Sequence, residues 1–365
     1  MVSESTKRQQ PLKQLQTFIE ERLPLADLQH LAEKKKVPMH RHSVWYYLGG
    51  IAGMLLAVQF VTGMLLMVYY VPEINAAHAS ILKLNTQVNF GWFVRSLHSW
   101  GANLMILALF VHLFSTYFMK AYRKPRELTW WSGLILMVLC LGFGFTGYLL
   151  PWDDVSFFAT KIGLDMASKM PLLGPTLAHM LRGGDTVSQA TISRFFMIHV
   201  AVLPALMIGL LGGHVFLVQT HGISEPDKFK NQPEEKKVYE KFFPDFFLKD
   251  ILVWILALNV LFALATMAPW SLGPEADPFA AAPIGIKPEW YFLAPFQFLK
   301  LIPANVGPIE GELFGIIIMA IVGLGFVFMP FYDKGINPIR SRVATTFGAF
   351  VLLALVVFSI WGAMS

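Results

Sequence analysis

The chain has 365 residues, of which 55% are hydrophobic and only 15% are charged, and its formal net charge is +5 at pH 7. Soluble globular domains carry about a quarter charged residues, so this composition, with a mean hydropathy of +0.53, argues against a soluble protein. The excess of basic residues does not indicate nucleic acid as a partner, because these residues lie in loops between apolar stretches. Cys140 is the single cysteine, which excludes an internal disulfide, a thiolate metal cluster and a Cys-x-x-Cys-His haem attachment.

The first 43 residues are polar and basic. Apolar and charged residues alternate over about 10–36, a pattern typical of an amphipathic helix that lies on a membrane surface. We therefore expect residues 1–43 to form a cytoplasmic amphipathic segment.

Seven stretches are long and apolar enough to cross a membrane, which takes roughly 20 residues: 44–71, 93–119, 130–150, 194–219, 249–269, 313–332 and 344–363. This pattern predicts an all-α membrane protein with seven transmembrane helices, the first four forming a bundle. Most of the 29 Lys and Arg residues precede the first span or follow the second, fourth and sixth. Because cytoplasmic loops carry the excess of basic residues, we expect a cytoplasmic N-terminus and a C-terminus on the opposite, positive side.

The charged segment 221–248 divides the membrane part in two. We expect a four-helix part at 44–220, a cytoplasmic linker at 221–248 and a three-helix part at 249–365. The long loops at 151–193 and 270–312 then lie on the positive side.

Four histidines lie inside two of the expected spans. Polar residues in a membrane span are costly and are functional candidates by default. His98 and His112 are fourteen residues apart, and His199 and His214 are fifteen apart. Each pair is then separated by about 21–22 Å along its helix and lies within about 60° of one face. In antiparallel helices, His98 would lie level with His199 at the positive side, and His112 level with His214 at the negative side. Each pair could supply two imidazole ligands to a haem iron.

A lone buried histidine more often hydrogen-bonds a neighbouring helix, but four that match in depth favour ligation. Gly49 and Gly63 in the first span, and Gly133 and Gly147 in the third, repeat the fourteen-residue interval. Glycine permits the close approach that a flat macrocycle needs. Ordinary packing of small residues explains single glycines but not the repeated interval.

Two arginines precede the candidate ligands at the positive side. Arg95 lies three residues before His98, and Arg194 lies five residues before His199. Guanidinium groups bind carboxylates well, so both are placed to pair with haem propionates. We expect four other histidines to lie in loops without a ligand role: His40, His42, His78 and His179.

The arrangement of these residues resembles that of the cytochrome b family. The resemblance is carried in order, over about residues 37–340, by NFGWFVRSLHSWGANLMILALFVHLF, KPRELTWWSG, FGFTGYLLPWDD, TISRFFMIHVAVLPALM and KPEWYFLAPFQFLK. The fifteen-residue interval and KPRELTW are similar to the chloroplast-type cytochrome bf branch. The fusion of both parts, and LKDIL at Lys249 and Asp250, are similar to the mitochondrial-type branch. The resemblance implies the cytochrome b subunit of a quinol-oxidising cytochrome bc complex in a bacterial inner membrane, with two non-covalent b-type haems.

The resemblance also implies quinol oxidation at the positive side. Glu289 of the Pro-Glu-Trp-Tyr string would accept a proton, and burial should raise its pKa. Outside this family context, a Glu that packs a loop or caps a helix would be the better interpretation. The expected pocket residues are Tyr148, Pro151, Pro288, Tyr291, Phe292 and Phe296.

One electron would pass to a Rieske-type iron–sulfur partner, and the other through both haems to a quinone at the negative side. There Lys249 and Asp250 would relay protons, with a contribution from His221. Charges that merely anchor a helix end are the alternative for Lys249 and Asp250. The other implied partners are a c-type cytochrome, membrane lipids and a second copy of the complex.

The sequence departs from the chloroplast-type branch at an extra haem that a Cys attaches covalently. Tyr47 stands at the position of that Cys, and Gln219 stands where a basic residue accompanies the haem. We therefore predict no covalent haem.

Two other classes of protein remain as alternatives. A dihaem membrane anchor of a dehydrogenase also uses paired histidines, but has fewer spans and no Pro-Glu-Trp-Tyr loop. A transporter could use membrane histidines to relay protons, but transporters tend to show inverted repeats and broken helices, which this sequence does not.

Overall fold

The computed structural model describes residues 17–18 and 35–365. Within this part of the chain, seven helices are long and apolar enough to cross a membrane: Ser43–Met67, Gly91–Phe118, Glu127–Tyr148, Gln189–His221, Phe242–Met267, Gly311–Tyr332 and Pro338–Met364. The seven expected spans are confirmed, and the chain is a multi-pass membrane protein. The amphipathic helix expected at 10–36 lies almost entirely outside the described residues.

The spanning segments are helical because lipid offers no partners for backbone N–H and C=O groups, so each segment must satisfy them internally. The regular helices in these spans are α3 (Tyr47–Met67), α5 (Gly91–Phe118), α6 (Glu127–Tyr148), α9 (Gln189–Met197), α10 (Leu203–His221), α12 (Phe247–Met267), α14 (Gly311–Tyr332) and α15 (Pro338–Met364). A 3-10 turn (Ser43–Tyr46) precedes α3, and π turns at Ile198–Val202 and Phe242–Phe246 precede α10 and α12.

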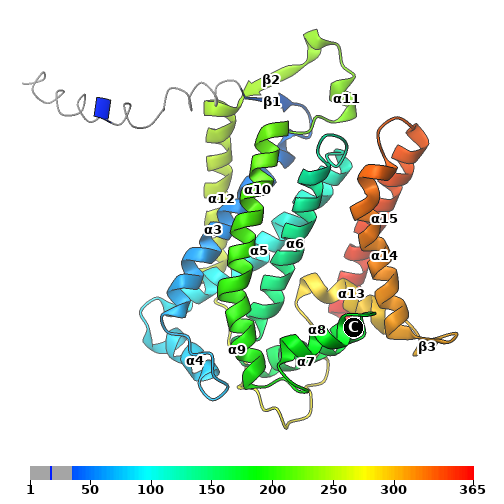
Figure 1. The fold of residues 1–365 in the computed structure, drawn as a ribbon. Coiled ribbons are helices and arrows are strands. Elements are labelled where there is room, and N and C mark those ends of the chain that lie inside the picture. The colour runs from blue at the N-terminus through cyan, green and yellow to red at the C-terminus, as the bar shows by residue number, and fades with distance from the viewer. Residues whose placement is uncertain (1–16, 19–34) are drawn as a thin grey trace, which may run out of the picture.

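The spans form one bundle (Figure 1). Helix α3 packs on α5, and α6 packs on α10, while α12 lies against α3 and α5. Helices α14 and α15 stand at the opposite side of the bundle, where α15 contacts α5 and α14 contacts α6. Of the helices that carry the four candidate histidines, α5 therefore contacts α3, α6, α12 and α15, and α10 packs on α6.

Short elements cover both ends of the bundle (Figure 1). At one end, β1 (Lys36–Met39) pairs antiparallel with β2 (Val238–Lys241), beside α11 (Asp227–Lys230) and a 3-10 turn (Glu234–Lys236). At the other end lie α4 (Ala77–Gln87), α7 (Asp154–Ser168), α8 (Gly174–Arg182) and α13 (Trp290–Lys300). The hairpin of β3 (Asn305–Val306) and β4 (Ile309–Glu310) lies beside them.

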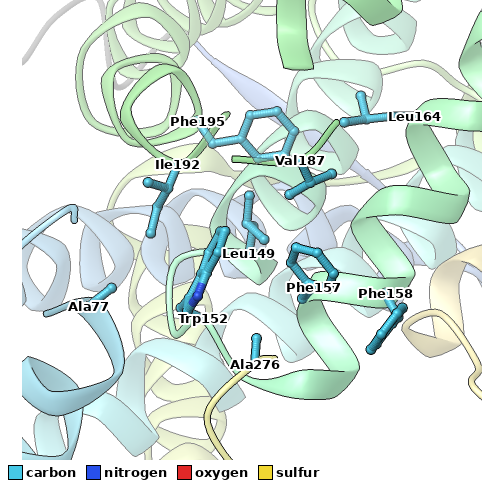
Figure 2. Packing of buried hydrophobic residues seen from close by; sticks show 10 residues of the cluster. All are labelled: Ala77, Leu149, Trp152, Phe157, Phe158, Leu164, Val187, Ile192, Phe195 and Ala276. Carbon is cyan, nitrogen blue, oxygen red and sulfur yellow. The ribbon is translucent and has the colours of Figure 1, made fainter. Parts of the chain in front are cut away.

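A buried apolar core holds the second end together (Figure 2). Trp152, with φ of 53°, turns the chain after α6, and its ring packs against Phe157 of α7 at 5.4 Å between ring centroids. Asp153 then caps α7 by accepting the backbone N–H of Ser156 at 2.9 Å. The same core includes Ile192 and Phe195 of α9 and Leu149. It therefore fixes α7 and α9 relative to the end of α6.

Hydrogen bonds join the three-helix part to the first four spans. Trp130 donates to the carbonyl of Phe326 at 2.8 Å, Trp131 donates to Val327 at 2.8 Å, and Tyr117 donates to Ala344 at 2.6 Å. These three contacts link α5 and α6 with α14 and α15.

A charged cluster at the end with β1 and β2 strengthens this junction. Asp333, which is 0% exposed, accepts from Tyr122 at 2.6 Å. Its two carboxylate oxygens also accept from Nη2 of Arg123, at 2.9 and 3.0 Å. Arg123 also donates to Asp227 at 2.8 Å. Burial by itself would raise the pKa of Asp333, but the hydrogen bonds from Tyr122 and Arg123 hold it below its ordinary value.

Candidate functional site

The rings of His98 and His199 face each other at the same depth of the bundle. Their centroids are 6.3 Å apart, and their planes are inclined by 68°. A metal ion held between two imidazole nitrogens needs roughly 6 Å between ring centres, because metal–imidazole bonds are about 2 Å long. The spacing of this pair therefore fits two axial ligands of one iron.

A π turn explains how fifteen residues in one helix match fourteen in the other. At Ile198–Val202 the backbone N–H of Leu203 bonds to the carbonyl of Ile198, five residues earlier. Pro204 has no N–H to offer the preceding turn, which favours this wider spacing. The extra residue is absorbed in the turn, so His199 and His214 lie closer to one face than the approximate 60° predicted for a regular helix.

The second pair, His112 and His214, lies further along the bundle, beside Gly49 of α3 and Gly133 of α6. Between the two pairs is a buried apolar cluster that includes Leu56, Met105 and Met207. Met105 is seven residues from both His98 and His112. The bundle thus has two imidazole layers separated by an apolar layer.

Each of the four predicted glycines faces one imidazole: Gly49 faces His112, Gly63 faces His98, Gly133 faces His214 and Gly147 faces His199. A Cβ at the first three would lie 3.3 Å from Cε1 of the ring, and a Cβ at Gly147 would lie 2.6 Å from it. From the sequence, these glycines were expected to make room for the macrocycle. In the structure they let α3 and α6 approach the imidazole rings themselves.

Three buried hydroxyls that the sequence reasoning missed contact the same rings. Their bonds to the imidazole Nδ1 atoms are Thr62 to His98 at 2.9 Å, Thr146 to His199 at 3.1 Å and Ser132 to His214 at 2.9 Å. Each hydroxyl directly precedes one of the facing glycines. These hydroxyl residues could have been found from the sequence, because each is a Ser or Thr directly before a glycine of the fourteen-residue pattern.

Bonding of Nδ1 leaves the other ring nitrogen, Nε2, for a metal. Such oriented imidazoles, facing in pairs beside glycines, fit the chemistry of two bis-histidine haem sites.

Both predicted propionate partners are bound to backbone carbonyls. Arg95, which is 5% exposed, donates to Trp270 at 2.7 Å and to Ser271 at 2.9 Å. Arg194 donates to the carbonyl of Met180. These arginines fasten α8 and the segment after α12 to the bundle, and their contact with propionates stays a prediction.

A cavity of about 570 Å³ lies between α6, α7, α13 and α14. Six predicted residues line it: Tyr148, Pro288, Glu289, Tyr291, Phe292 and Phe296. Most of the other lining residues are apolar, among them Phe145, Ile162 and Met319. The cavity therefore combines apolar walls with a few polar groups, as a site for a lipid-soluble ring would require.

Pro151, also predicted to line this pocket, is not among the lining residues. The turn at its neighbour Trp152 carries the chain away from the cavity and into the buried core of Figure 2.

Glu289 is the residue before α13 and, among the described residues, the one carboxylate that lines the cavity. Burial raises its pKa above the ordinary value for a glutamate, and the negative charge of Asp153 adds to this effect. A proton acceptor in this position would titrate nearer to neutral pH.

The residues predicted at the negative side occupy two places. Asp250 lies against α3, where a Cβ at Gly50 would be 2.6 Å from its Oδ2 atom. Its neighbour Lys249 pairs with Glu240 of β2. His221 ends α10, and its carbonyl accepts from Arg126 at 3.0 Å. No hydrogen bond within the described residues joins His221 to Lys249 or Asp250.

The positions that bear on a covalent haem are filled by other contacts. The ring of Tyr47 stacks on Phe246 with centroids 4.7 Å apart, and Gln219 accepts from Lys35. Two of the four histidines expected in loops lie instead in short helices, so that part of the prediction is wrong. His78 of α4 contacts the carbonyl of Gly273 at 2.8 Å, and His179 of α8 has a side chain that is 69% exposed.

Comparison with known proteins gives matches along both parts of the chain. A family model described as Cytochrome b/b6/petB matches residues 33–222, and one described as Cytochrome b(C-terminal)/b6/petD matches residues 275–365. A solved structure titled Hyperthermophilic respiratory Complex III shares the fold, with a TM-score of 0.76 at 24% identity over 95% of this chain and 98% of that chain.

Two curated relatives are similar in sequence. The cytochrome bc complex cytochrome b subunit of Chlorobaculum thiosulfatiphilum is 46% identical over 324 residues, which is 88% of this chain and 74% of the relative. The menaquinol:cytochrome c reductase cytochrome b subunit of Geobacillus thermodenitrificans is 40% identical over 222 residues, 59% of this chain and 99% of the relative. With both of its parts matched in order and close relatives over most of its length, the chain belongs to the cytochrome b family.

Proposed function

We propose that the chain is the cytochrome b subunit of a bc-type quinol:cytochrome c oxidoreductase, with His98 and His199 holding one b haem and His112 and His214 holding another. The observation that carries the proposal is the facing pair His98 and His199, 6.3 Å apart. The names of the curated relatives, a bc complex subunit and a menaquinol:cytochrome c reductase subunit, support it. Haem bound at these two levels would supply one-electron transfer across the membrane.

At the positive side, the cavity of about 570 Å³ takes the quinol. A quinol that loses two electrons also loses two protons, so its site needs a base. Glu289 serves as that base, since burial brings its pKa closer to the working pH. Tyr148 and Tyr291 supply hydroxyls to the same cavity, and Phe292 and Phe296 supply apolar walls.

At the negative side, Asp250 and Lys249 deliver protons to a quinone. Lys249 connects the site to the aqueous phase, because its side chain is half-exposed and paired with Glu240. His221, at the end of α10, contributes to this proton delivery from a separate helix.

The complex includes a Rieske-type iron–sulfur subunit, which takes the first electron from each quinol, and a c-type cytochrome. It forms a homodimer in a bacterial inner membrane, with the N-terminus in the cytoplasm and the C-terminus at the positive side. Both haems are non-covalent, because Tyr47 replaces the cysteine that attaches the extra haem in the chloroplast-type branch.

A reduced-minus-oxidised difference spectrum of the purified complex, combined with a redox titration, tests the proposal. We expect two b-type components, of which His98→Leu removes one and His112→Leu removes the other. His179→Leu, at an exposed position of α8, is the matched control and should retain both. Absence of b-type bands in the wild-type complex would refute the proposal, as would retention of both components in His98→Leu and His112→Leu.

A further inference from the structure

The four imidazoles do not have equivalent hydrogen-bond partners. His98, His199 and His214 each contact a hydroxyl through Nδ1, at 2.9, 3.1 and 2.9 Å respectively. The Nδ1 atom of His112 is buried and has no partner among the described residues. One ligand of the negative-side pair therefore differs from the other three.

The difference can be traced to one position in α3. The hydroxyl residues are each followed by the glycine that faces the same ring, as in Thr62 and Gly63. At the fourth place, the residue before Gly49 is Leu48, whose side chain has no acceptor. Leu48 and Thr62 are fourteen residues apart and so occupy equivalent places in the repeat.

The hydroxyls are constrained to accept from the rings. The single hydrogen of the Thr62 hydroxyl is donated to the carbonyl of Val58 at 2.7 Å. Only lone pairs remain for His98, so its Nδ1 must carry the hydrogen and its Nε2 must be free to bind a metal. Thr146 and Ser132 donate in the same way to the carbonyls of their own helix, at 2.8 and 2.9 Å.

An imidazole that donates from Nδ1 is a more basic ligand to iron. Stronger donation stabilises the more positive, oxidised iron and lowers its reduction potential, and hydrogen bonding around the ligands is one of the means by which proteins adjust haem potentials.

We propose that Thr62, Thr146 and Leu48 act as positioning residues that separate the reduction potentials of the two haem sites. Both ligands of the positive-side pair have hydroxyl acceptors, which lowers the potential there. Leu48 leaves His112 without one, which keeps the potential of the negative-side pair higher. This difference in potential favours electron transfer from the positive-side haem site to the negative-side haem site. This inference rests on the proposed function, because it requires haem at both levels.

Thr62 offers the sharpest single test. Backbone carbonyls of Phe143 and Thr129 also lie within hydrogen-bonding reach of His199 and His214. Among the described residues, the His98 ring has no such carbonyl partner, and its Nδ1 contacts only the hydroxyl of Thr62.

The experiment is a redox titration of the b-haem absorbance in the intact complex, with electron paramagnetic resonance of the oxidised haems. Thr62→Val removes the acceptor at similar side-chain volume, Thr62→Ser keeps it, and Leu48→Thr adds one opposite His112. We expect Thr62→Val to favour reduction of the positive-side component about tenfold, or roughly 59 mV for a one-electron couple. Leu48→Thr should disfavour reduction of the negative-side component by a similar factor, and Thr62→Ser should match the wild type.

Both b components must be visible in the wild type, since their absence would refute the proposed function and not this inference alone. With both visible, unchanged potentials in Thr62→Val and Leu48→Thr would overturn the inference and leave the proposed function standing. If Thr62→Val does not retain haem, Leu48→Thr decides: a lowered negative-side potential supports the inference, and an unchanged one overturns it.

Discussion

Gly147→Ala is the substitution that should disturb one haem level most directly. A Cβ at Gly147 would lie 2.6 Å from Cε1 of His199 and 3.1 Å from its Nδ1. Carbon atoms in contact normally stay about 3.5–4.0 Å apart, so the ring must move by roughly 1 Å. The hydrogen bond from His199 to Thr146, at 3.1 Å, would be strained by the same movement.

The expected size of the effect follows from the cost of overpacking a well-filled interior, about 1–3 kcal/mol. If this cost falls on ligand geometry, haem affinity at the positive-side level drops roughly 5- to 150-fold. The haem-to-protein ratio of the purified complex, with the amplitude of each b component in a redox titration, measures the loss. The negative-side component, held by His112 and His214, should keep its amplitude.

Gly63→Ala provides the matched control in the same layer. Its Cβ would lie 3.3 Å from Cε1 of His98, which a shift of a few tenths of an ångström relieves, so both haems should be retained. Equal haem content in Gly147→Ala and Gly63→Ala would show that the approach of α6 to His199 does not control binding.

Three further predictions concern single carboxylates. Asp333→Asn breaks a buried ion pair and should lower the free energy of unfolding by about 3–5 kcal/mol. This loss should be seen as a lower thermal midpoint of the detergent-solubilised protein, and Asp185→Asn, at a fully exposed side chain, should leave the midpoint unchanged. Because the pKa of Asp333 is held below its ordinary value, its stabilising contribution is complete above that ordinary value and is lost as pH falls through the folded-state pKa; a midpoint insensitive to acid would contradict this. The rate of quinol oxidation should rise with pH through the raised pKa of Glu289. Asp153→Asn should move this rise to lower pH, and Glu289→Gln should remove it. Turnover measured against pH tests this, and a pH profile that is the same in both variants as in the wild type would contradict it. Asp250→Asn should slow reoxidation of the negative-side haem and leave its reduction by quinol intact, and stopped-flow spectra with wild-type reoxidation would remove Asp250 from the mechanism.

The spans were predictable from the sequence because bilayer thickness sets their length. The expected span 93–119 corresponds to α5 at Gly91–Phe118. The last span was placed too late, at 344, because Arg340 and Arg342 read as loop residues. Helix α15 begins at Pro338, where the side chain of Asn337 accepts the backbone N–H of Ile339 at 2.8 Å.

Elements that depend on distant partners were not predictable in the same way. Strands β1 and β2 pair residues about 200 positions apart, as in Val37 with Glu240, and their short charged sequences show no alternation of apolar residues. The π turn at Ile198–Val202 was likewise not predicted. Its only trace in the sequence is the fifteen-residue interval between His199 and His214, one residue longer than the interval between His98 and His112.

Within the site, residue type and spacing pointed to the paired histidines and the glycines, and the family resemblance implied most of the cavity lining. Pro151 was misplaced because the direction of the chain after α6 depends on the packing of Trp152. The hydroxyl of Thr62 was missed because a threonine in an apolar helix usually bonds only its own backbone. Its second bond, to His98, requires knowledge of which face α3 turns toward α5.

The junction between the two parts of the chain bears on how such a protein can be encoded. Trp130 and Trp131 donate to backbone carbonyls of α14, and Arg123 binds Asp333 directly. The two parts therefore recognise each other through residues on their own surfaces. The peptide connection through 221–248 adds local concentration, not specificity. Two polypeptides translated from separate reading frames would thus find the same register, and a gene could be split or fused at this point without redesign of either product.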